Sequence, residues 1–205
     1  IGVAIKSRQE RGPVRVGVIG LGTGTIAAYG RPGDVYRFYD IDPRVVQLAR
    51  GEFSFLADSP AKVEVALGDA RLTLEREPPQ NFDVLAVDAF SSDAIPVHLI
   101  TREALGIYLK HMKSDGIVAF HVSNRFLDLI PVVARIAKEQ GAHAVLVNDD
   151  PDDEDESLRS RSDWVLVSRD PKALEAKPIK DVSEPVEEQP GWRLWTDDYN
   201  NLVQV

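Results

Sequence analysis

The chain has 205 residues, of which 43% are hydrophobic and 28% are charged, and its formal net charge is −9. This length and composition are typical of one folded domain and exclude a globally disordered chain. The negative charge argues against a nucleic-acid backbone as the binding partner. Cysteine is absent and the four histidines are scattered, so disulfides, thiolate chemistry and a metal site are not expected.

Nothing in the sequence has the pattern of a membrane span or of a signal peptide. No apolar run approaches the ~20 residues that are needed to cross a bilayer. We therefore expect this domain to lie in the cytoplasm. The chain begins with Ile1 and not with methionine, which suggests that it is part of a longer protein.

Strand and helix patterns alternate along the first half of the chain. Short apolar and β-branched runs predict four strands, and a glycine turn follows the first of them. Pro43 is typical of the first turn of a helix. The strands are expected at residues 14–19, 35–39, 62–67 and 82–87, with helical segments at 25–29, from residue 43, and up to residue 74.

The second half continues this pattern and then changes it. Thr101 is typical of a helix N-cap, and a further helix is expected at residues 131–140. Between these helices, residues 116–122 predict another buried strand. Residues 142–147 and 164–168 predict two strands with only an acidic stretch between them. We expect these two strands to form an antiparallel pair at the edge of the sheet.

These elements predict an α/β fold, in which a doubly wound, mostly parallel sheet ends in an antiparallel strand and carries helices on both faces. Ligands of such sheets bind at the carboxyl ends of the strands. We expect residues 1–170 to form a nucleoside-binding catalytic domain. Residues 171–205 are expected to form a weakly structured segment rich in proline, glutamate and lysine, and a tail that packs on the same domain.

A glycine-rich turn and the acidic residues after the next two strands point to a nucleoside ligand. The turn Gly20-Leu21-Gly22-Thr23-Gly24 follows the first strand, where glycines let the backbone approach a ligand. Asp40 ends the second strand, about 20 residues further on, where a carboxylate can accept both ribose hydroxyls. Asp69 and Ala70 follow the third strand, where the Asp69 side chain could reach an adenine amino group. A purely structural glycine turn is the alternative, and Asp42 is expected to cap the next helix.

The fourth strand is followed by Asp88-Ala89-Phe90-Ser91-Ser92-Asp93-Ala94-Ile95-Pro96. This loop resembles the catalytic loop of spermidine synthase-like aminopropyltransferases. Residues 87–101, 118–125 and 195–199 are similar to the branch of that family in which the domain is fused to membrane-spanning segments. The resemblance extends from about residue 14 to the end of the chain. It implies a class I methyltransferase-like fold.

The resemblance also implies an activity, which is aminopropyl transfer from decarboxylated S-adenosylmethionine to a small cationic amine with release of methylthioadenosine. Asp88 would orient the amine and accept its proton, and Asp93 would steer the cationic substrate. His121 would orient substrate, unless its imidazole is hydrogen-bonded within the fold. Tyr199 and the acidic residues beside it would close over the pocket from the tail. A homodimer, and a membrane-embedded domain in a longer chain, are compatible with this interpretation.

Three departures from the family pattern leave alternatives open. Thr23 stands where the family has an acidic residue that pairs with the amine of the decarboxylated cofactor, so S-adenosylmethionine itself stays a candidate. A tyrosine–glutamine pair before the first strand is missing, and Ala89-Phe90 is an insertion after Asp88. The alternatives are an S-adenosylmethionine-dependent small-molecule methyltransferase and a non-catalytic nucleoside-binding domain appended to a membrane protein.

Overall fold

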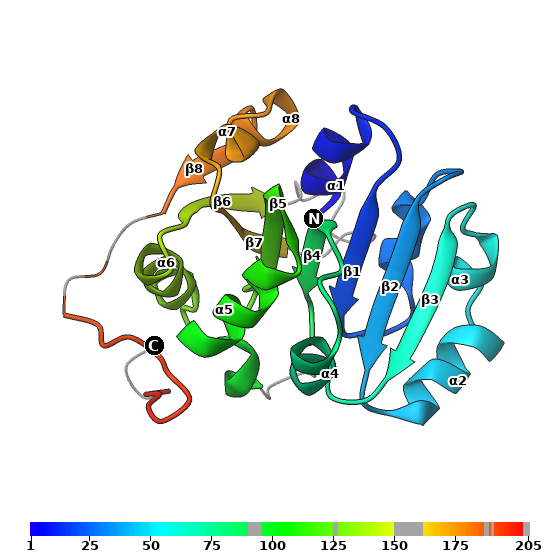
Figure 1. Cartoon of the computed structure of the whole chain (residues 1–205), viewed down its shortest axis with the longest axis horizontal. Helices are drawn as coiled ribbons and strands as arrows, with labels where there is room; N and C mark the ends of the chain where they lie inside the picture. Colours follow the sequence, from blue (N-terminus) through cyan, green and yellow to red (C-terminus); the bar gives the residue numbers. More distant parts are fainter. Residues whose placement is uncertain (90–95, 125–126, 150–161, 187–188, 190, 203–205) are drawn as a thin grey trace, which may run out of the picture.

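The computed structural model describes residues 1–89, 96–124, 127–149, 162–186, 189 and 191–202. One eight-stranded sheet runs through these residues, and helices cover both of its faces (Figure 1). No helix of the described segments combines the length and the apolar character that a bilayer crossing requires.

The sheet is mostly parallel, with the order β3-β2-β1-β4-β5-β7-β6-β8. The strands from β3 to β5 in this order pair in parallel, whereas β7 pairs antiparallel with both β5 and β6, and β8 pairs antiparallel with β6. The strands are β1 (Arg15–Ile19), β2 (Val35–Asp40), β3 (Lys62–Leu67), β4 (Phe82–Val87), β5 (Met112–His121), β6 (His143–Asp149), β7 (Ser162–Ser168) and β8 (Ser183–Pro185).

The helices divide between the two faces of the sheet. One hydrophobic cluster joins α4, α5 and α6 to the sheet, and a second joins α1, the 3-10 turn η1, α2, α7 and α8 to the opposite face. The helical elements are α1 (Gly2–Gln9), η1 (Thr25–Tyr29), α2 (Pro43–Gly51), α3 (Phe55–Asp58), α4 (Ala70–Arg76), η2 (Val97–Leu99), α5 (Arg102–Lys110), α6 (Ile130–Glu139), α7 (Pro171–Leu174) and α8 (Lys177–Lys180).

The predicted fold class is confirmed, and several local predictions agree with it. All six residues of β4 are buried, as expected for a strand in the middle of a doubly covered sheet. The Asp42 carboxylate accepts a hydrogen bond from the backbone N–H of Arg44 at 2.8 Å, and Thr101 caps α5 through the N–H of Ala104. These caps fix where two helices begin, at the same edge of the sheet as the strand ends.

The N-terminal helix α1 was not predicted, because its buried face is partly polar. Ser7, Arg8 and Gln9 are all buried, and the side chain of each makes at least one hydrogen bond. The Arg8 guanidinium, for example, contacts Asp115, which is 107 residues away in the sequence. A reading of apolar periodicity counts such residues as exposed and therefore does not detect the helix.

Of two further predictions about the second half, one was wrong. The segment at residues 171–189 was expected to be weakly structured, but it contains α7, α8 and the edge strand β8. Asp170 caps α7 by accepting the N–H of Lys172, and Ile179 is buried against the sheet. The expected antiparallel pair is present: β6 and β7 pair at that end of the sheet, and only the three-residue strand β8 lies outside them.

Candidate functional site

The glycine loop lies at the carboxyl end of β1 and packs against the end of β4. Gly20 has a φ of +95°, and a Cβ on it would overlap the backbone carbonyl of Asp88, lying 2.8 Å from the carbonyl carbon. Gly24 is the N-cap of η1 with a φ of +86°. A Cβ on Gly22 would meet no atom within 4 Å. Gly20 is thus required by packing, whereas Gly22 faces open space.

The loop leads into a short 3-10 turn, and the chain does not form the longer helix that usually follows such a loop. η1 has five residues, and β2 begins only six residues after η1 ends. Pro32 and Gly33 lie in a turn that Asp34 closes, because its carboxylate accepts the N–H of Arg31 at 2.9 Å. Proline and glycine here prevent continuation of the helix. This part of the sheet face therefore receives little cover from the segment after β1.

Asp40 connects the end of β2 to the glycine loop. Its Oδ2 accepts a hydrogen bond from the backbone N–H of Leu21 at 2.9 Å, and its Oδ1 accepts one from the N–H of Asp42 at 2.9 Å. Each carboxylate oxygen can accept a second hydrogen bond. The carboxylate is therefore oriented by the backbone and keeps acceptor capacity for a ligand.

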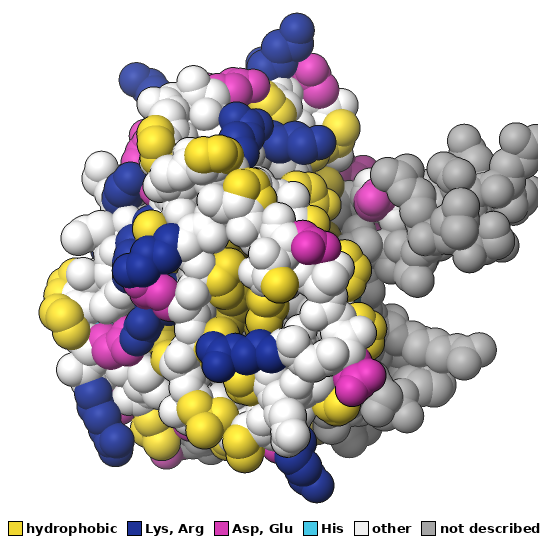
Figure 2. All heavy atoms as spheres, turned by 90° about the vertical axis from the view of Figure 1, so that its right-hand side faces the viewer, with side chains coloured by type: hydrophobic (Ala, Val, Ile, Leu, Met, Phe, Trp, Pro, Cys, Tyr) yellow, Lys and Arg dark blue, Asp and Glu magenta, His cyan; other side chains and the backbone are white. Residues whose placement is uncertain are grey.

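Apolar side chains lie exposed next to this carboxylate. Ile41, directly after Asp40, is 71% exposed, and Leu67 at the end of β3 is 58% exposed. Figure 2 faces the side of the molecule where β3 and α2 lie, and it shows apolar side chains gathered among lysines and arginines. Exposed apolar side chains beside an oriented carboxylate are suited to covering the flat face of a base.

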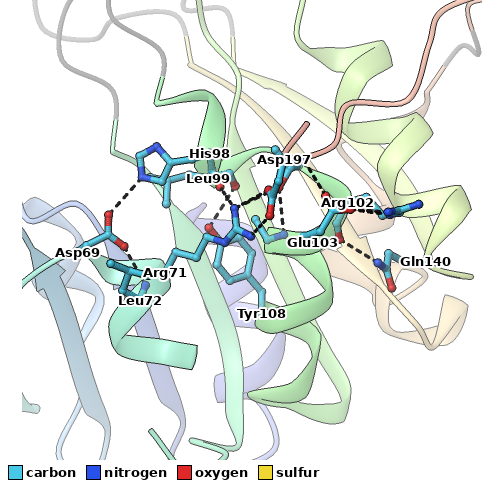
Figure 3. Close-up of polar contacts among 12 residues, drawn as sticks. Asp69, Arg71, Leu72, His98, Leu99, Arg102, Glu103, Tyr108, Gln140 and Asp197 are labelled. Atoms are coloured by element: carbon cyan, nitrogen blue, oxygen red, sulfur yellow. Dashed lines mark hydrogen bonds and ion pairs between the residues drawn. The ribbon is translucent and has the colours of Figure 1, made fainter. Parts of the chain in front are cut away.

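Asp69 is the N-cap of α4, where its Oδ1 accepts the N–H of Leu72 at 2.8 Å. Its Oδ2 lies 3.3 Å from the Nε2 atom of His98, which comes from the segment after β4 (Figure 3). Ala70, the next residue, is buried. Asp69 thus has a structural role as a cap, and the second oxygen points toward the neighbouring strand-end segment.

A clasp of polar contacts joins the C-terminal segment to α4 and α5 (Figure 3). The guanidinium of Arg71 donates two hydrogen bonds to the carboxylate of Asp197, at 2.7 and 2.5 Å. The hydroxyl of Thr101 donates to the same carboxylate at 2.8 Å, and Glu103 accepts the N–H of Asp197 at 3.0 Å. The hydrogen bonds from Arg71 lower the pKa of Asp197. The sequence analysis did not identify Arg71.

A cleft of about 680 Å³ opens beside the end of β4, between η1, the start of α1, the ends of β5 and β6, and the start of β7. Asp88 and His121 line it on one side, and Asp149 lines it from the end of β6. The lining also includes the aromatic side chains of Tyr29, Phe55 and Trp164 and the basic side chain of Lys6. The cleft lies where the short η1 leaves the sheet face without a long helix.

Asp88 and His121 are in direct contact at the mouth of this cleft. The Oδ1 atom of Asp88 lies 2.7 Å from Nδ1 of His121, and Nε2 of His121 lies 2.9 Å from the Oγ atom of Ser123. The indole of Trp164 stacks on the imidazole, with 4.7 Å between the ring centroids. Ser123 and Trp164 were not predicted. Ser123 lies two residues after His121. Trp164 is the residue of β7 that pairs with His121 in the antiparallel register with β5.

The structure does not bring every predicted residue to this cleft. The ring of Tyr199 lies under the Arg193 guanidinium at 3.9 Å, and Tyr199 pairs through its backbone with Thr196. Asp93 lies outside the described residues. Asp40 and Asp69 lie at neighbouring strand ends but do not line the cleft itself. The predicted cofactor residues and the Asp88 cleft are therefore adjacent regions of one sheet edge.

Comparison with known proteins supports the resemblance stated from the sequence. The chain is 34% identical over 119 residues to a polyamine aminopropyltransferase of Vibrio vulnificus (strain CMCP6). The match covers 56% of this chain and 38% of the relative, so the similarity extends over well under half of that protein. No protein-family model matches the chain.

Solved structures confirm the class I methyltransferase-like fold. A probable spermidine synthase from Corynebacterium glutamicum superposes with a TM-score of 0.63 at 19% identity, over 82% of this chain and 61% of that one. The human methyltransferase-like protein 13, solved in complex with SAH, superposes with a TM-score of 0.61 at 16% identity, over 94% of this chain and 91% of that one. At these identities the likeness concerns the fold.

Proposed function

We propose that the chain is an aminopropyltransferase that transfers the aminopropyl group of decarboxylated S-adenosylmethionine to a small amine. The observation that carries the proposal is the position of Asp88. Its backbone packs against the glycine loop, and its carboxylate lines the cleft. A residue at the boundary between a nucleoside site and an amine site is where the reacting atoms of two substrates would meet. The sequence similarity to a polyamine aminopropyltransferase agrees with this proposal.

The residues at the strand ends are suited to hold the cofactor. Gly20, Gly22, Thr23 and Gly24 would cradle it, and the open space above Gly22 leaves room for a ligand. Asp40 would accept the ribose hydroxyls with the acceptor capacity that its two backbone hydrogen bonds leave. Asp69 and Ala70 would contact the adenine, with Ile41 covering its face. A human protein that shares the fold has been solved in complex with SAH, which supports a cofactor of this class.

The cleft has the chemistry that a cationic amine requires. Asp88 and Asp149 supply two carboxylates, and Trp164, Tyr29 and Phe55 supply aromatic surfaces that attract ammonium groups. Asp88 would hold the amine that reacts, and Asp149 would pair with a second ammonium group of the acceptor. Asp93 would also steer the cationic substrate toward Asp88.

The reaction that we propose is a displacement at the carbon next to the sulfonium. The amine nitrogen bonds to this carbon while the carbon–sulfur bond breaks, and the electron pair of that bond stays on sulfur to give methylthioadenosine. The secondary ammonium that forms then loses one proton to the Asp88 carboxylate. Asp88 also orients the neutral amine before the attack, and general-base assistance of this kind typically contributes about 10²- to 10⁴-fold in rate.

A specific observation favours a second candidate, which is a methyltransferase that uses S-adenosylmethionine. Thr23 has no charge with which to pair the amine of the decarboxylated cofactor. The human methyltransferase-like protein also shows that this fold occurs in a protein that binds SAH. The two carboxylates that line the cleft, those of Asp88 and Asp149, favour aminopropyl transfer, because they would attract a cationic acceptor.

Product analysis by mass spectrometry separates the two candidates. The protein would be incubated with a panel of diamines and with either S-adenosylmethionine or its decarboxylated form. We expect an aminopropylated amine and methylthioadenosine from the decarboxylated cofactor only. Methylated products from S-adenosylmethionine would support the second candidate and contradict the first. Calorimetry with both cofactors and with methylthioadenosine provides the control, since the absence of all binding would leave only a structural role.

A further inference from the structure

Both ring nitrogens of His121 contact side chains that follow strands: Asp88 follows the neighbouring strand β4, and Ser123 follows β5 itself. Nδ1 lies 2.7 Å from Oδ1 of Asp88, at the end of β4, and Nε2 lies 2.9 Å from Oγ of Ser123. The Ser123 hydroxyl in turn accepts the backbone N–H of Asp163 at 2.6 Å. Stacking against Trp164 fixes the plane of the imidazole. A chain of hydrogen bonds therefore runs from β7 through Ser123 and His121 to the Asp88 carboxylate.

The donors and acceptors of this chain assign the position of the imidazole proton. An ionised Asp88 can only accept, so Nδ1 of His121 must carry the hydrogen. The Ser123 oxygen already accepts from the backbone of Asp163, and its hydroxyl hydrogen is available to donate to Nε2. The contacts thus place a hydrogen on Nδ1 and, with the Ser123 hydroxyl as donor to Nε2, favour the Nδ1–H tautomer. A second-layer hydrogen bond commonly fixes a histidine tautomer in this way.

Resting on the aminopropyltransferase proposed above, we propose that His121 is a positioning residue for Asp88 and does not bind the acceptor amine. The imidazole N–H fixes Oδ1 of Asp88, so that the other carboxylate oxygen, Oδ2, is presented to the cleft as the proton acceptor. The proton of the new ammonium group moves to Oδ2, while Nδ1–H stays bound to Oδ1. Ser123 holds the tautomer that makes this arrangement possible.

The geometry disfavours the alternative that His121 contacts the amine directly. Both ring nitrogens already face side-chain oxygen atoms at hydrogen-bond distance. One ring face is covered by the indole of Trp164. The side chain of Asp88 is 32% exposed and that of His121 is 24% exposed, so the carboxylate is the more accessible of the two groups.

Three substitutions at His121 test the proposal by steady-state kinetics. His121→Asn places an amide nitrogen near the position of Nδ1, whereas His121→Gln reaches toward the position of Nε2. We expect His121→Ala to lower kcat by about ten- to hundredfold, because a small misplacement of a reacting group can cost up to about 10² in rate. The KM for the cofactor should stay within about twofold, since only the chemical step is affected. His121→Asn should restore most of the rate, and His121→Gln should not.

A double-mutant cycle that combines Ser123→Ala with His121→Asn tests the role of Ser123. We expect Ser123→Ala to lower kcat in the wild-type background and to have no effect in the His121→Asn background, because an asparagine amide needs no tautomer. Equal effects in both backgrounds would contradict the role of Ser123. Wild-type kcat in His121→Ala, or equal rescue by asparagine and glutamine, would overturn the role of His121.

Nitrogen-15 spectroscopy of the histidine side chains tests the same inference without turnover. We expect the Nδ1–H tautomer of His121 at neutral pH in the wild type and loss of this preference in Asp88→Ala. An Nε2–H tautomer in the wild type would overturn the inference. The comparison with Asp88→Asn separates the two levels of the account. If that variant loses turnover while His121→Ala does not, only the positioning role fails, whereas full turnover in Asp88→Asn contradicts the proposed base itself.

Discussion

Gly20 packs directly against the backbone carbonyl of Asp88, so closely that a Cβ on Gly20 would overlap it. The contact joins the first residue of the glycine loop to Asp88, which directly follows β4 and lines the cleft. The two halves of the proposed site are thereby fixed relative to each other by main-chain packing. A change at Gly20 should consequently disturb both cofactor binding and the placement of the Asp88 carboxylate.

Gly20→Ala should therefore be strongly destabilising. The left-handed conformation and the overlap together should cost at least about 3 kcal/mol in the free energy of unfolding. Gly141→Ala is the matched control, because Gly141 also has a positive φ, of +66°, but a Cβ there would meet nothing within 4 Å. That control should cost only about 1 kcal/mol. Denaturant unfolding of both variants measures the difference, and equal losses would contradict the packing argument.

Asp40→Ala should weaken the binding of methylthioadenosine at least about tenfold, because each hydrogen bond to a charged acceptor contributes about 1.5–3 kcal/mol. The glycine loop should also loosen, since the N–H of Leu21 loses its acceptor. Asp42→Ala removes a neighbouring carboxylate that caps α2 and serves as the control. It should lower stability by about 1 kcal/mol without changing affinity. Calorimetric affinities of Asp40→Ala within twofold of the wild type would refute the ribose assignment.

Asp69→Asn separates the two roles of Asp69. Asparagine is a good N-cap, so the amide oxygen can keep the hydrogen bond from Leu72 and α4 should stay intact. The amide nitrogen would then replace Oδ2 and oppose an adenine amino group with another donor. We expect the preference for adenosine-type over inosine-type ligands to fall at least about tenfold. One hydrogen bond to the adenine amino group is lost, and two donors then face each other. Unchanged discrimination in competition binding would place the base elsewhere.

The clasp between Arg71 and Asp197 should respond to pH in a defined direction. Hydrogen bonds from Arg71 lower the pKa of Asp197 from its usual value of 3.8, so the clasp stabilises the fold above this pH. Its contribution should disappear as the pH falls through the lower pKa of the folded state. The Asp197 side chain is 42% exposed, so solvent screening limits the effect to about 1 kcal/mol or less.

Thermal unfolding of Asp197→Asn across pH measures this effect. The difference from the wild type should be present at neutral pH and absent in strong acid. Asp198→Asn, at the adjacent exposed position, should match the wild type at every pH. A constant difference between wild type and Asp197→Asn from neutral pH to strong acid would show that the clasp does not depend on the carboxylate charge.

The sequence predicted the elements whose signal is local. β3 and β4 have the predicted bounds, and the cap at Asp42 follows from an aspartate directly before a proline. By contrast, α1 is stabilised by hydrogen bonds from Arg8 to groups more than 100 residues away, which no local pattern encodes. The helical segment expected at residues 25–29 is the 3-10 turn η1, which the following proline–glycine turn keeps short.

Prediction of the site shows the same division. Asp88 and His121 were expected at one edge of the sheet because both end parallel strands. Their direct contact depends on the neighbouring positions of β4 and β5 and on side-chain rotamers, and the stacking of Trp164 depends on the inserted strand β7. Arg71 was missed because its partner, Asp197, is 126 residues away. Tertiary contacts of this kind have no periodic signature in the sequence.

If Asp88 is the general base of an aminopropyl transfer, as we propose, Asp88→Asn should lose turnover. The amide keeps the shape of the side chain but cannot accept the proton. With the diamine that the wild type uses best, we expect kcat to fall by about 10²- to 10⁴-fold while the calorimetric affinity for methylthioadenosine is unchanged. An Asp88→Asn protein that retains wild-type turnover with this acceptor would contradict the account.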